Sequence, residues 1–279
     1  MNERGSLVDR GTQTWVKATG RTVPLTTFPW LNGPVGDPSR IGDTWIEREG
    51  DRLGGQLREG GGLLGSFDDL ASDRFDPAQL VPAVVEFYEN TVDWRLDVWS
   101  QWCPFMFPGG WFLSIVFARR LQQLALPLRP LDVALGMDSR VVSCVDDGGA
   151  QLGAAWLRTL RSTGQTVYSG WYGITQLPLP RGPSVRVMFP LPNGSLAIFL
   201  EPSVDAEGAL HLTSPIARFG DNGAYLIVER GPAMVSVRRV PLFERFRVFL
   251  DNEGILRADH AVDLGPIPTL RLHYRLQQK

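Results

Sequence analysis

The sequence predicts an α+β fold, in which a large curved antiparallel β-sheet or barrel packs against helices from the N-terminal half of the chain. Two observations predict it. Beyond residue 140, short stretches with the period of a β-strand follow one another, separated by turn signals such as Asn193-Gly194. Before them, Asp76-Pro77 opens a stretch whose apolar residues recur at helical spacing. We therefore expect the sheet over residues ~140–276.

A single domain accommodates all 279 residues. We expect it to have three parts: residues 1–75, rich in glycine and irregular or β; residues 76–130, helical and rich in aromatic residues; and residues 131–279, antiparallel β. Within the first part, β-favouring residues on both sides of Gly20-Arg21 predict a strand pair over Thr12–Val23.

The helical part begins with a strong start signal. Asp76 can serve as the N-cap, Pro77 takes the first helical position, and Gln79 can close a capping box. The apolar residues expected on one face of this helix are Val81, Val84, Val85 and Tyr88. A second helix is expected from Gly110 to about Leu124.

Between the two helices the apolar period changes to that of a strand. Val92, Trp94, Leu96 and Val98 alternate with polar residues, which indicates a strand with one buried face. The further expected strands are Val141–Val145, Ala154–Arg161, Thr166–Gln176, Val185–Leu191, Leu196–Leu200, Ala209–Thr213, Ala224–Glu229, Met234–Val240, Leu242–Leu250, Ile255–Leu264 and Thr269–Leu276. Their short connections are typical of an antiparallel meander.

Composition and missing motifs exclude several classes of function. The formal net charge of -2 lacks the basic excess typical of nucleic-acid binders, so we expect no nucleic-acid partner. The sequence has no phosphate-binding loop, no dinucleotide fingerprint and no nucleophile elbow. Its three histidines are widely spaced and its two cysteines form no C-x-x-C motif. We therefore expect no metal and no cofactor.

The cellular environment can also be inferred from the sequence. The longest apolar run, Trp111–Ala118, is shorter than the ~20 residues of a membrane-spanning helix. Met1–Asp9 carries charge and lacks the apolar core of a signal peptide. Cys103 and Cys144 fit reduced thiols in a core. We expect a cytoplasmic protein without a transmembrane segment, and the sequence leaves its oligomeric state open.

Strand alternation separates inward from outward polar residues near the end of the chain. Glu244, His260 and Tyr274 each fall on the apolar face of a predicted strand, whereas His211 and His273 fall on outward faces. These three inward residues are our candidate catalytic residues.

Pairing of the strands would bring two of these residues together. A turn centred on Asn252 places Glu244 directly opposite His260, and a register slip by two leaves them diagonal neighbours. A buried carboxylate beside a buried imidazole is costly unless the two interact, and such coupled groups are candidates for acid–base catalysis. The alternative is a polar pair that only fixes the strand register.

A dense aromatic stretch lies just before the midpoint of the chain. Four of the nine tryptophans fall between Trp94 and Trp111, around the break Pro108-Gly109-Gly110. Such a cluster fills a core, walls or covers a ligand cavity, or contacts a membrane or partner. Trp94 and Trp99, on a strand and at its end, fit a core most simply. The candidate ligand-binding residues are Trp99, Trp102, Phe105, Phe107 and Trp111.

Four segments resemble the soluble C-terminal region of YndJ-type bacterial proteins: Phe87-Tyr88-Glu89, Leu121–Asp132, Phe189–Ser195 and Leu270–Leu276. The resemblance covers about the last two thirds of the chain. It implies neither an activity nor catalytic residues.

These observations favour two functions. The first is binding of a hydrophobic small molecule in a barrel or between sheet and helix, either for binding alone or for cofactor-independent cyclisation or isomerisation. Whether the chain is an enzyme therefore stays open. Glu244, His260 and Tyr274 would orient or polarise the ligand. The alternative is an interaction module without an active site, whose aromatic segment 99–117 docks a partner or a membrane surface.

Overall fold

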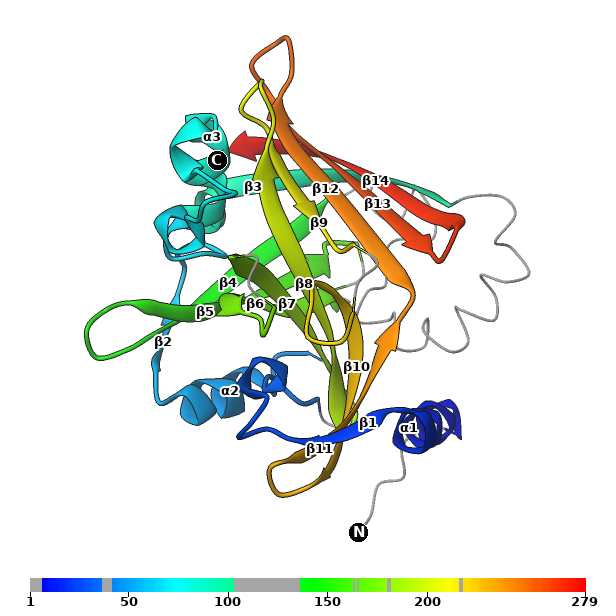
Figure 1. Ribbon diagram of the computed structural model, residues 1–279. Helices are drawn as coiled ribbons and strands as arrows, with labels where there is room; N and C mark the ends of the chain where they lie inside the picture. Colours follow the sequence, from blue (N-terminus) through cyan, green and yellow to red (C-terminus); the bar gives the residue numbers. More distant parts are fainter. Residues whose placement is uncertain are drawn as a thin grey trace.

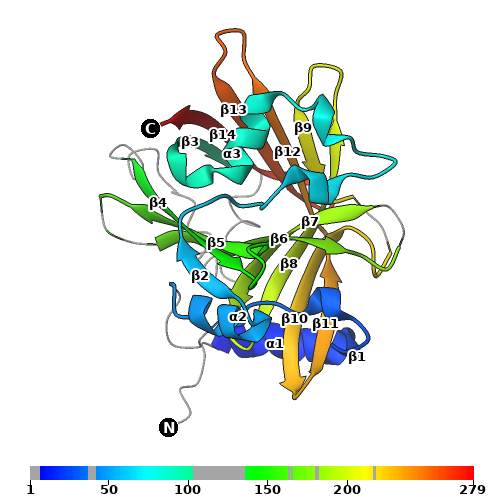
Figure 2. The ribbon, with the colours of Figure 1, turned by 90° about the vertical axis from the view of Figure 1, so that its left-hand side faces the viewer.

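The computed structural model describes residues 7–36, 42–102, 136–162, 164, 166–179, 182–215 and 218–279. Its main feature is a 14-stranded antiparallel sheet (Figures 1 and 2). The main path of this sheet follows the order β2-β4-β5-β6-β7-β8-β9-β12-β13-β14-β3. β10 also pairs with β8, and β11 and β1 continue from β10 as a branch.

The strands are β1 (Arg21–Pro24), β2 (Gln56–Glu59), β3 (Trp94–Trp102), β4 (Met137–Val145), β5 (Gln151–Leu160), β6 (Thr166–Gln176), β7 (Pro183–Leu191), β8 (Gly194–Val204), β9 (Leu210–Thr213), β10 (Gly223–Gly231), β11 (Met234–Val240), β12 (Leu242–Leu250), β13 (Leu256–Leu264) and β14 (Ile267–Gln278). The α-helices are α1 (Leu7–Thr19), α2 (Ile46–Leu53) and α3 (Pro82–Glu89). Short 3₁₀ helices span Pro29–Leu31, Phe67–Leu70, Pro77–Gln79 and Thr91–Asp93.

The sheet bends along β8 and does not close. Up to Leu200, β8 pairs with β7 and β10, whereas Glu201–Val204 pairs with β9. The first half of the sheet comprises β2, β4, β5, β6, β7 and β8 up to Leu200, together with the branch β10, β11 and β1. The second half comprises β9, β12, β13, β14 and β3. Among the described residues, β2 and β3 form no ladder with each other. The predicted antiparallel sheet is therefore confirmed, and the barrel alternative is wrong.

The main apolar core lies between the two halves. It joins Trp156 and Phe189 of the first half to Val248 and Leu256 of the second. Figure 1 shows the strands of the second half running across those of the first, with α3 at one end of them. Val84, Phe87 and Tyr88 of α3 complete this core. The side of β12, β13 and β14 that faces this core is called the inner face below.

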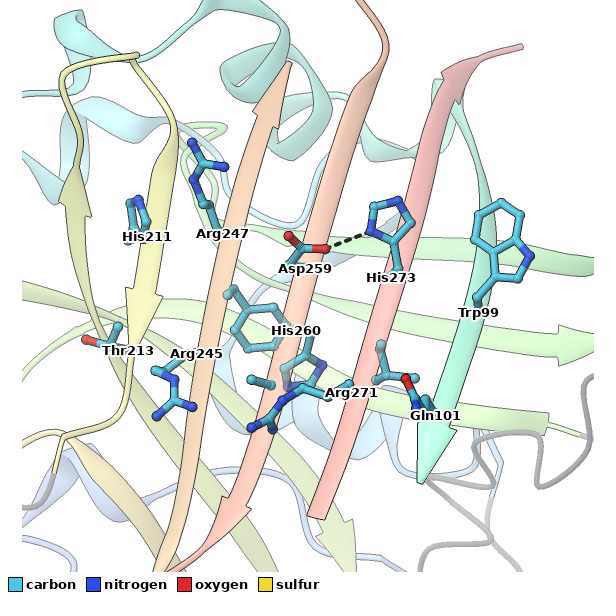
Figure 3. A pocket seen from close by; sticks show the side chains of 13 residues that line it. Trp99, Gln101, His211, Thr213, Arg245, Arg247, Asp259, His260, Arg271 and His273 are labelled. Atoms are coloured by element: carbon cyan, nitrogen blue, oxygen red, sulfur yellow. Dashed lines mark hydrogen bonds and ion pairs between the residues drawn. The ribbon is translucent and has the colours of Figure 1, made fainter. Parts of the chain in front are cut away.

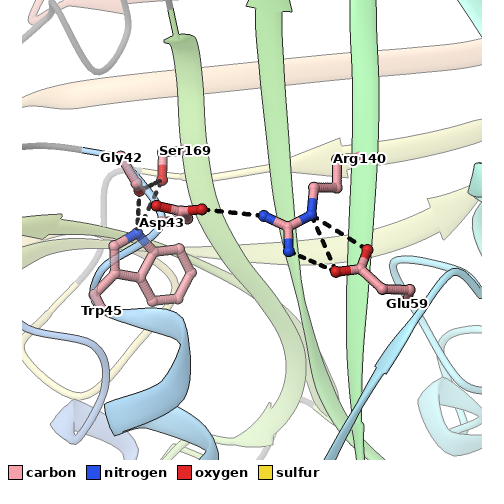
Figure 4. A network of polar contacts seen from close by, with 6 residues as sticks. All are labelled: Gly42, Asp43, Trp45, Glu59, Arg140 and Ser169. Atoms are coloured by element: carbon pink, nitrogen blue, oxygen red, sulfur yellow. Dashed lines mark hydrogen bonds and ion pairs between the residues drawn. The ribbon is translucent and has the colours of Figure 1, made fainter.

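The other side of the first half carries a second core, which N-terminal residues cover. These include Trp30, Leu31, Trp45 and Ile46. The Trp45 indole donates a hydrogen bond to the Ser169 hydroxyl at 2.9 Å (Figure 4). Nearby, the Arg140 guanidinium on β4 binds the carboxylates of Asp43 and Glu59. Polar contacts thus fasten the N-terminal segment to β4 and β6.

The other side of β12, β13 and β14, called the outer face below, belongs to none of the apolar cores that the described residues form. The residues of this face alternate along each strand with those of the inner face, and most of their side chains are charged. Within the described part of the chain, this surface of the second half thus carries no apolar packing.

The N-terminal elements differ from two predictions. Residues 7–19 form α1, so the predicted strand pair over Thr12–Val23 is wrong, and only β1 remains of it. The predicted helix after Asp76 divides into two. Asp76 does accept a hydrogen bond from the Ala78 amide at 3.1 Å, but α3 starts only at Pro82. A residue before proline avoids the helical region, and Val81 is extended accordingly.

Other expectations agree with the structure or cannot be compared with it. β7 and β8 form a hairpin at Asn193, whose φ of 57° is the left-handed conformation such turns require. Cys144 is a buried free thiol. Cys103 and the helix expected over residues 110–124 lie outside the described residues.

Candidate functional site

The inner face of β12 and β13 brings two of the predicted residues together. Phe246 lies opposite His260, and Glu244 lies opposite Val262, so Glu244 and His260 are diagonal neighbours. The direct pairing around Asn252 is wrong by two residues.

The connecting loop explains this register. It spans residues 251–255, and the Asp251 carboxylate accepts hydrogen bonds from the amides of Glu253 and Ile255, each at 2.9 Å. Gly254 takes a φ of 74°, which closes the loop on a left-handed residue. A carboxylate that holds its own loop in this way lengthens the turn, and the strand pairing shifts with it.

The diagonal pair is close and largely buried. The His260 Nε2 and Glu244 Oε2 atoms are 3.3 Å apart, and each side chain is 12% exposed. The imidazole also stacks on Phe246, with ring centres 3.7 Å apart. His260 Nε2 makes no aligned hydrogen bond within the described residues. The imidazole is therefore positioned by its stacking on Phe246, with the Glu244 carboxylate beside it.

Tyr274 joins the pair from β14, and an arginine from the first half faces it. The Arg158 guanidinium carbon lies 5.4 Å from the Tyr274 ring centre and 5.4 Å from that of Trp156. Arg158 is 5% exposed. Its Nη2 atom has no hydrogen-bond partner among the described residues. Burying a cation with an unpartnered donor costs free energy, so Arg158 stands out among the residues of this core.

Two further tyrosines complete the group. Tyr168 and Tyr172 project from β6, and their hydroxyls hydrogen-bond each other. Their rings contact Trp156 at centre distances of 5.2 Å and 5.7 Å. We call the six residues from five strands the polar cluster: Arg158, Tyr168, Tyr172, Glu244, His260 and Tyr274.

The phenols of the polar cluster hold their protons strongly. Burial raises the pKa of Tyr168, Tyr172 and Tyr274 above the ordinary tyrosine value, and the negative charge of Glu244 adds to each increase. The positive charge of Arg158 opposes the increase at Tyr274 without cancelling it. The cluster therefore offers neutral O–H donors and one cationic N–H donor beside a carboxylate–imidazole pair.

Packing around the cluster is uneven. Val248 and Leu256, near α3, are almost completely buried, whereas Glu244, His260 and Val262 keep part of their surface exposed. The polar cluster thus lies where the inner face is less tightly covered. Groups at such a position can meet a ligand and still be largely shielded from water.

The aromatic candidates do not gather at this cluster. Trp99 points to the outer face and is 53% exposed, so its assignment to the core is wrong. It lies opposite His273, one of the two histidines predicted to face outward. The backbone of Trp102 pairs with Leu270. Phe105, Phe107 and Trp111 lie outside the described residues.

Sequence reasoning missed three members of the cluster, although a signal was present. Arg158 follows Ala154 and Trp156 at the inward positions of β5, just as Glu244 interrupts the apolar face of β12. Tyr168 and Tyr172 share one face of β6 in the same way. An arginine at an inward position of a strand is the same signal that identified Glu244.

Three comparisons relate the chain to known proteins. No family model matches it, and no solved structure matches it. A search of curated proteins finds the "Uncharacterized membrane protein YndJ" of Bacillus subtilis (strain 168), 28% identical over 221 residues. The match covers 77% of this chain but only 38% of that protein, so the chain corresponds to well under half of its relative.

No helix within the described part of the chain has the length and hydrophobicity needed to cross a bilayer. The alignment and the segments quoted from the sequence agree: the chain resembles YndJ-type proteins.

Proposed function

We propose that this chain binds a hydrophobic small molecule that carries an oxygen-containing head, with the head held by the polar cluster between the two halves of the sheet. The observation that carries the proposal is Arg158, a 5% exposed cation whose Nη2 atom has no partner among the described residues. A carboxylate or carbonyl oxygen would satisfy this donor, and the neighbouring phenols would add neutral donors.

Binding can be tested with a fluorescent fatty acid, cis-parinaric acid, and its methyl ester. Both have the same apolar chain, but only the acid presents a carboxylate to Arg158. We expect the acid to bind about tenfold more tightly than the ester, because hydrogen bonds to charged groups contribute about 1.5–3 kcal/mol. The Arg158→Met variant should bind both probes equally.

A matched control exists on the opposite side of the first half. Arg186 is 8% exposed, donates from Nη1 to the Asn32 carbonyl at 3.1 Å, and lies away from the polar cluster. Arg186→Met should keep the preference for the acid. Equal binding of acid and ester by the unaltered protein would refute the proposal, as would loss of the preference in Arg186→Met alone.

We further propose that the cluster can catalyse a cofactor-independent isomerisation. Glu244 would remove a proton from a carbon next to a carbonyl group, Arg158 and the phenols would bind the oxygen that gains negative charge, and the proton would return at another carbon. Cyclisation within the same enclosure is the related alternative. The closeness of Glu244 to His260, at 3.3 Å, supports a role in proton transfer.

The isomerisation can be followed with a β,γ-unsaturated ketone, because its conjugated isomer absorbs in the ultraviolet. Glu244→Gln should abolish any conversion, whereas Arg245→Gln, its outward neighbour on β12, should leave the rate unchanged. If Glu244→Gln lowers stability but converts the ketone at the same rate, Glu244 has only a structural role.

The interaction module remains a second proposal, favoured by one observation. Trp99, the first residue of the aromatic segment 99–117, is 53% exposed. If this segment mediates self-association, light scattering should show an oligomer that Trp99→Ser dissociates. A monomer at all concentrations would contradict self-association.

A further inference from the structure

The outer face of the second half contains a hollow of about 590 Å³, and His260 is the one member of the polar cluster that also lines it. Its residues come from β3, β9, β12, β13 and β14 (Figure 3). A volume of this order accommodates a small ligand. Unlike the inner face, its lining is rich in charged groups and carries one exposed indole, Trp99.

The strand register explains why the face is hollow. One row across the strands reads Thr213, Arg245, Ala261, Arg271 and Gln101. Ala261 is the shortest side chain of the row and stands between two arginines. A methyl group between two long side chains leaves a space above the sheet, and the arginines form its walls.

The two arginines are held in place by one carboxylate. Arg245 Nη2 and Arg271 Nη1 bind the two oxygens of Asp263 at 2.7 Å and 2.8 Å, and Asp263 is 8% exposed. Two cations share one anion here, so this trio has a net charge of +1. Every hydrogen bond described for Arg271 leaves from Nη1, and the one described for Arg245 leaves from Nη2. Each guanidinium therefore keeps nitrogen donors for a further anion.

At the opposite end of the hollow, carboxylates outnumber arginines. Arg247 is bound by two carboxylates, those of Asp205 and Glu207. His211 also contacts Asp205, at 2.9 Å. A ligand lying along the hollow would thus meet a cationic end and an end rich in acceptors, which suits hydroxyl donors.

Trp99 supplies a flat surface at the edge of the hollow. Its ring centre is 6.0 Å from that of His273, whose Nδ1 contacts Asp259 at 2.7 Å. Trp99 lies on the strand next to that of Arg271 and two residues along the ladder, so both are within reach of the same small molecule. An exposed indole beside polar groups offers an apolar face to a ring that is otherwise polar.

We propose that the outer hollow binds an anionic carbohydrate, a sugar that carries a phosphate or a carboxylate. The anion lies between Arg245 and Arg271 above Ala261, the sugar ring lies against Trp99, and hydroxyls meet the acidic end of the hollow. The arginines, Ala261 and the indole of this site lie on the opposite face of the sheet from the polar cluster, of which only His260 also lines the hollow. The inference does not rest on the proposed function.

Binding can be measured by nuclear magnetic resonance with the intact chain and the indole signal of Trp99, which is identified by its loss in Trp99→Phe. The probes are glucose 6-phosphate and glucuronic acid, which separate phosphate from carboxylate, with glucose and inorganic phosphate as comparisons. We expect one of the two anionic sugars to bind with a Kd of about 1 mM or below. Glucose and inorganic phosphate should each bind at least about tenfold more weakly.

Three variants test the geometry. Arg271→Gln should raise the Kd about tenfold, because it removes a charged donor. Ala261→Leu retains every charge but fills the floor of the hollow, and it should weaken binding at least as much. Trp99→Leu should weaken the binding of the anionic sugar more than the binding of inorganic phosphate. The positions are on an open face, so the thermal unfolding midpoint of each variant confirms that it folds.

A matched control lies on β13. Arg257 faces the same side, pairs with Asp251 at 2.7 Å and does not line the hollow. Arg257→Gln should change the Kd by less than about twofold. The inference is overturned if neither anionic sugar binds, if glucose binds equally well, if inorganic phosphate alone accounts for binding, or if folded Ala261→Leu binds normally. Each outcome is independent of parinaric acid binding at Arg158.

Discussion

The two faces of β12, β13 and β14 carry similar charged groups in different surroundings. On the inner face, Glu244 and His260 lie among apolar side chains, each 12% exposed. On the outer face, Arg245 and Arg271 share Asp263 but remain 56% and 38% exposed. Water screens the outer arginines, although the Asp263 side chain they share is only 12% exposed, whereas the inner groups must be satisfied by protein or ligand. Exposure, more than residue type, therefore decides which charged groups cost stability and which are free for recognition.

The largest difference between the faces is expected for two adjacent residues of β14. Leu272 is 4% exposed in the apolar core, and His273 points outward with its side chain 40% exposed. Leu272→Ala should lower the free energy of unfolding by about 2–5 kcal/mol. His273→Ala should lower it by less than about 1 kcal/mol. Urea denaturation measures both, and equal losses would show that the outer face is packed like the inner one.

A second difference concerns the five tyrosines, none of which lies on the outer face. Burial raises the pKa of all five: Tyr88, Tyr168, Tyr172, Tyr225 and Tyr274. A raised pKa in the folded state contributes stability below the unfolded value of about 10, and this contribution is lost as pH rises through the folded values. Stability should therefore fall above pH ~10.

Ultraviolet absorbance of tyrosinate checks this expectation directly. It should stay low in alkali until the chain unfolds, and then rise for all five residues together. Tyr172→Phe should make the loss of stability above pH ~10 less steep, because one ionising group is removed. Absorbance that titrates near pH ~10 while the fold is intact would mean that some of these phenols reach water.

The alternation of apolar and polar residues along the strands predicted most of the contrast between the faces. It placed Glu244, His260 and Tyr274 inward and His273 outward. Alternation assigns faces well because a strand has a period of two whatever its neighbours are. The prediction failed at Trp99 because residue type, which suggested a core, was followed there instead of alternation. Its position, five residues after inward Trp94, gives an outward face.

Long-range features were less predictable. The register depends on the Asp251 loop, and a sequence does not state how a carboxylate will hold its own turn. The open sheet depends on the bend in β8, where one strand changes partners at Leu200. Arg158 and the tyrosines of β6 come near Glu244 only because the two halves fold over each other, which local periodicity cannot indicate.

A third prediction concerns the stability that Asp205, beside the outer face, contributes at low pH. The hydrogen bond from His211 lowers the pKa of Asp205 to about 2, with the amides of Ala209 and Glu207 adding to the effect. A lowered pKa in the folded state contributes stability above the unfolded value, and this is lost as pH falls toward the folded value. The stability advantage of the unaltered protein over Asp205→Asn should thus shrink between pH ~4 and ~2.

Acid unfolding followed by circular dichroism measures this difference. Asp259→Asn offers a comparison on the same face, because Asp259 pairs with His273 and its side chain is 57% exposed. If the two variants lose stability with the same dependence on pH, the His211–Asp205 contact has no special role.

The smallest change in stability is expected at Arg245 on the outer face. Arg245 is 56% exposed and has one described ion pair, so Arg245→Gln should change the free energy of unfolding by less than about 1 kcal/mol. The loss should shrink further in high salt, because salt screens exposed pairs. Urea denaturation at low and high ionic strength measures it. A larger, salt-insensitive loss would mean that Asp263 depends on Arg245 as a buried charge does, and the outer trio would then be a structural element. A small loss would instead leave the Arg245 guanidinium free to serve recognition, since its removal costs the fold so little.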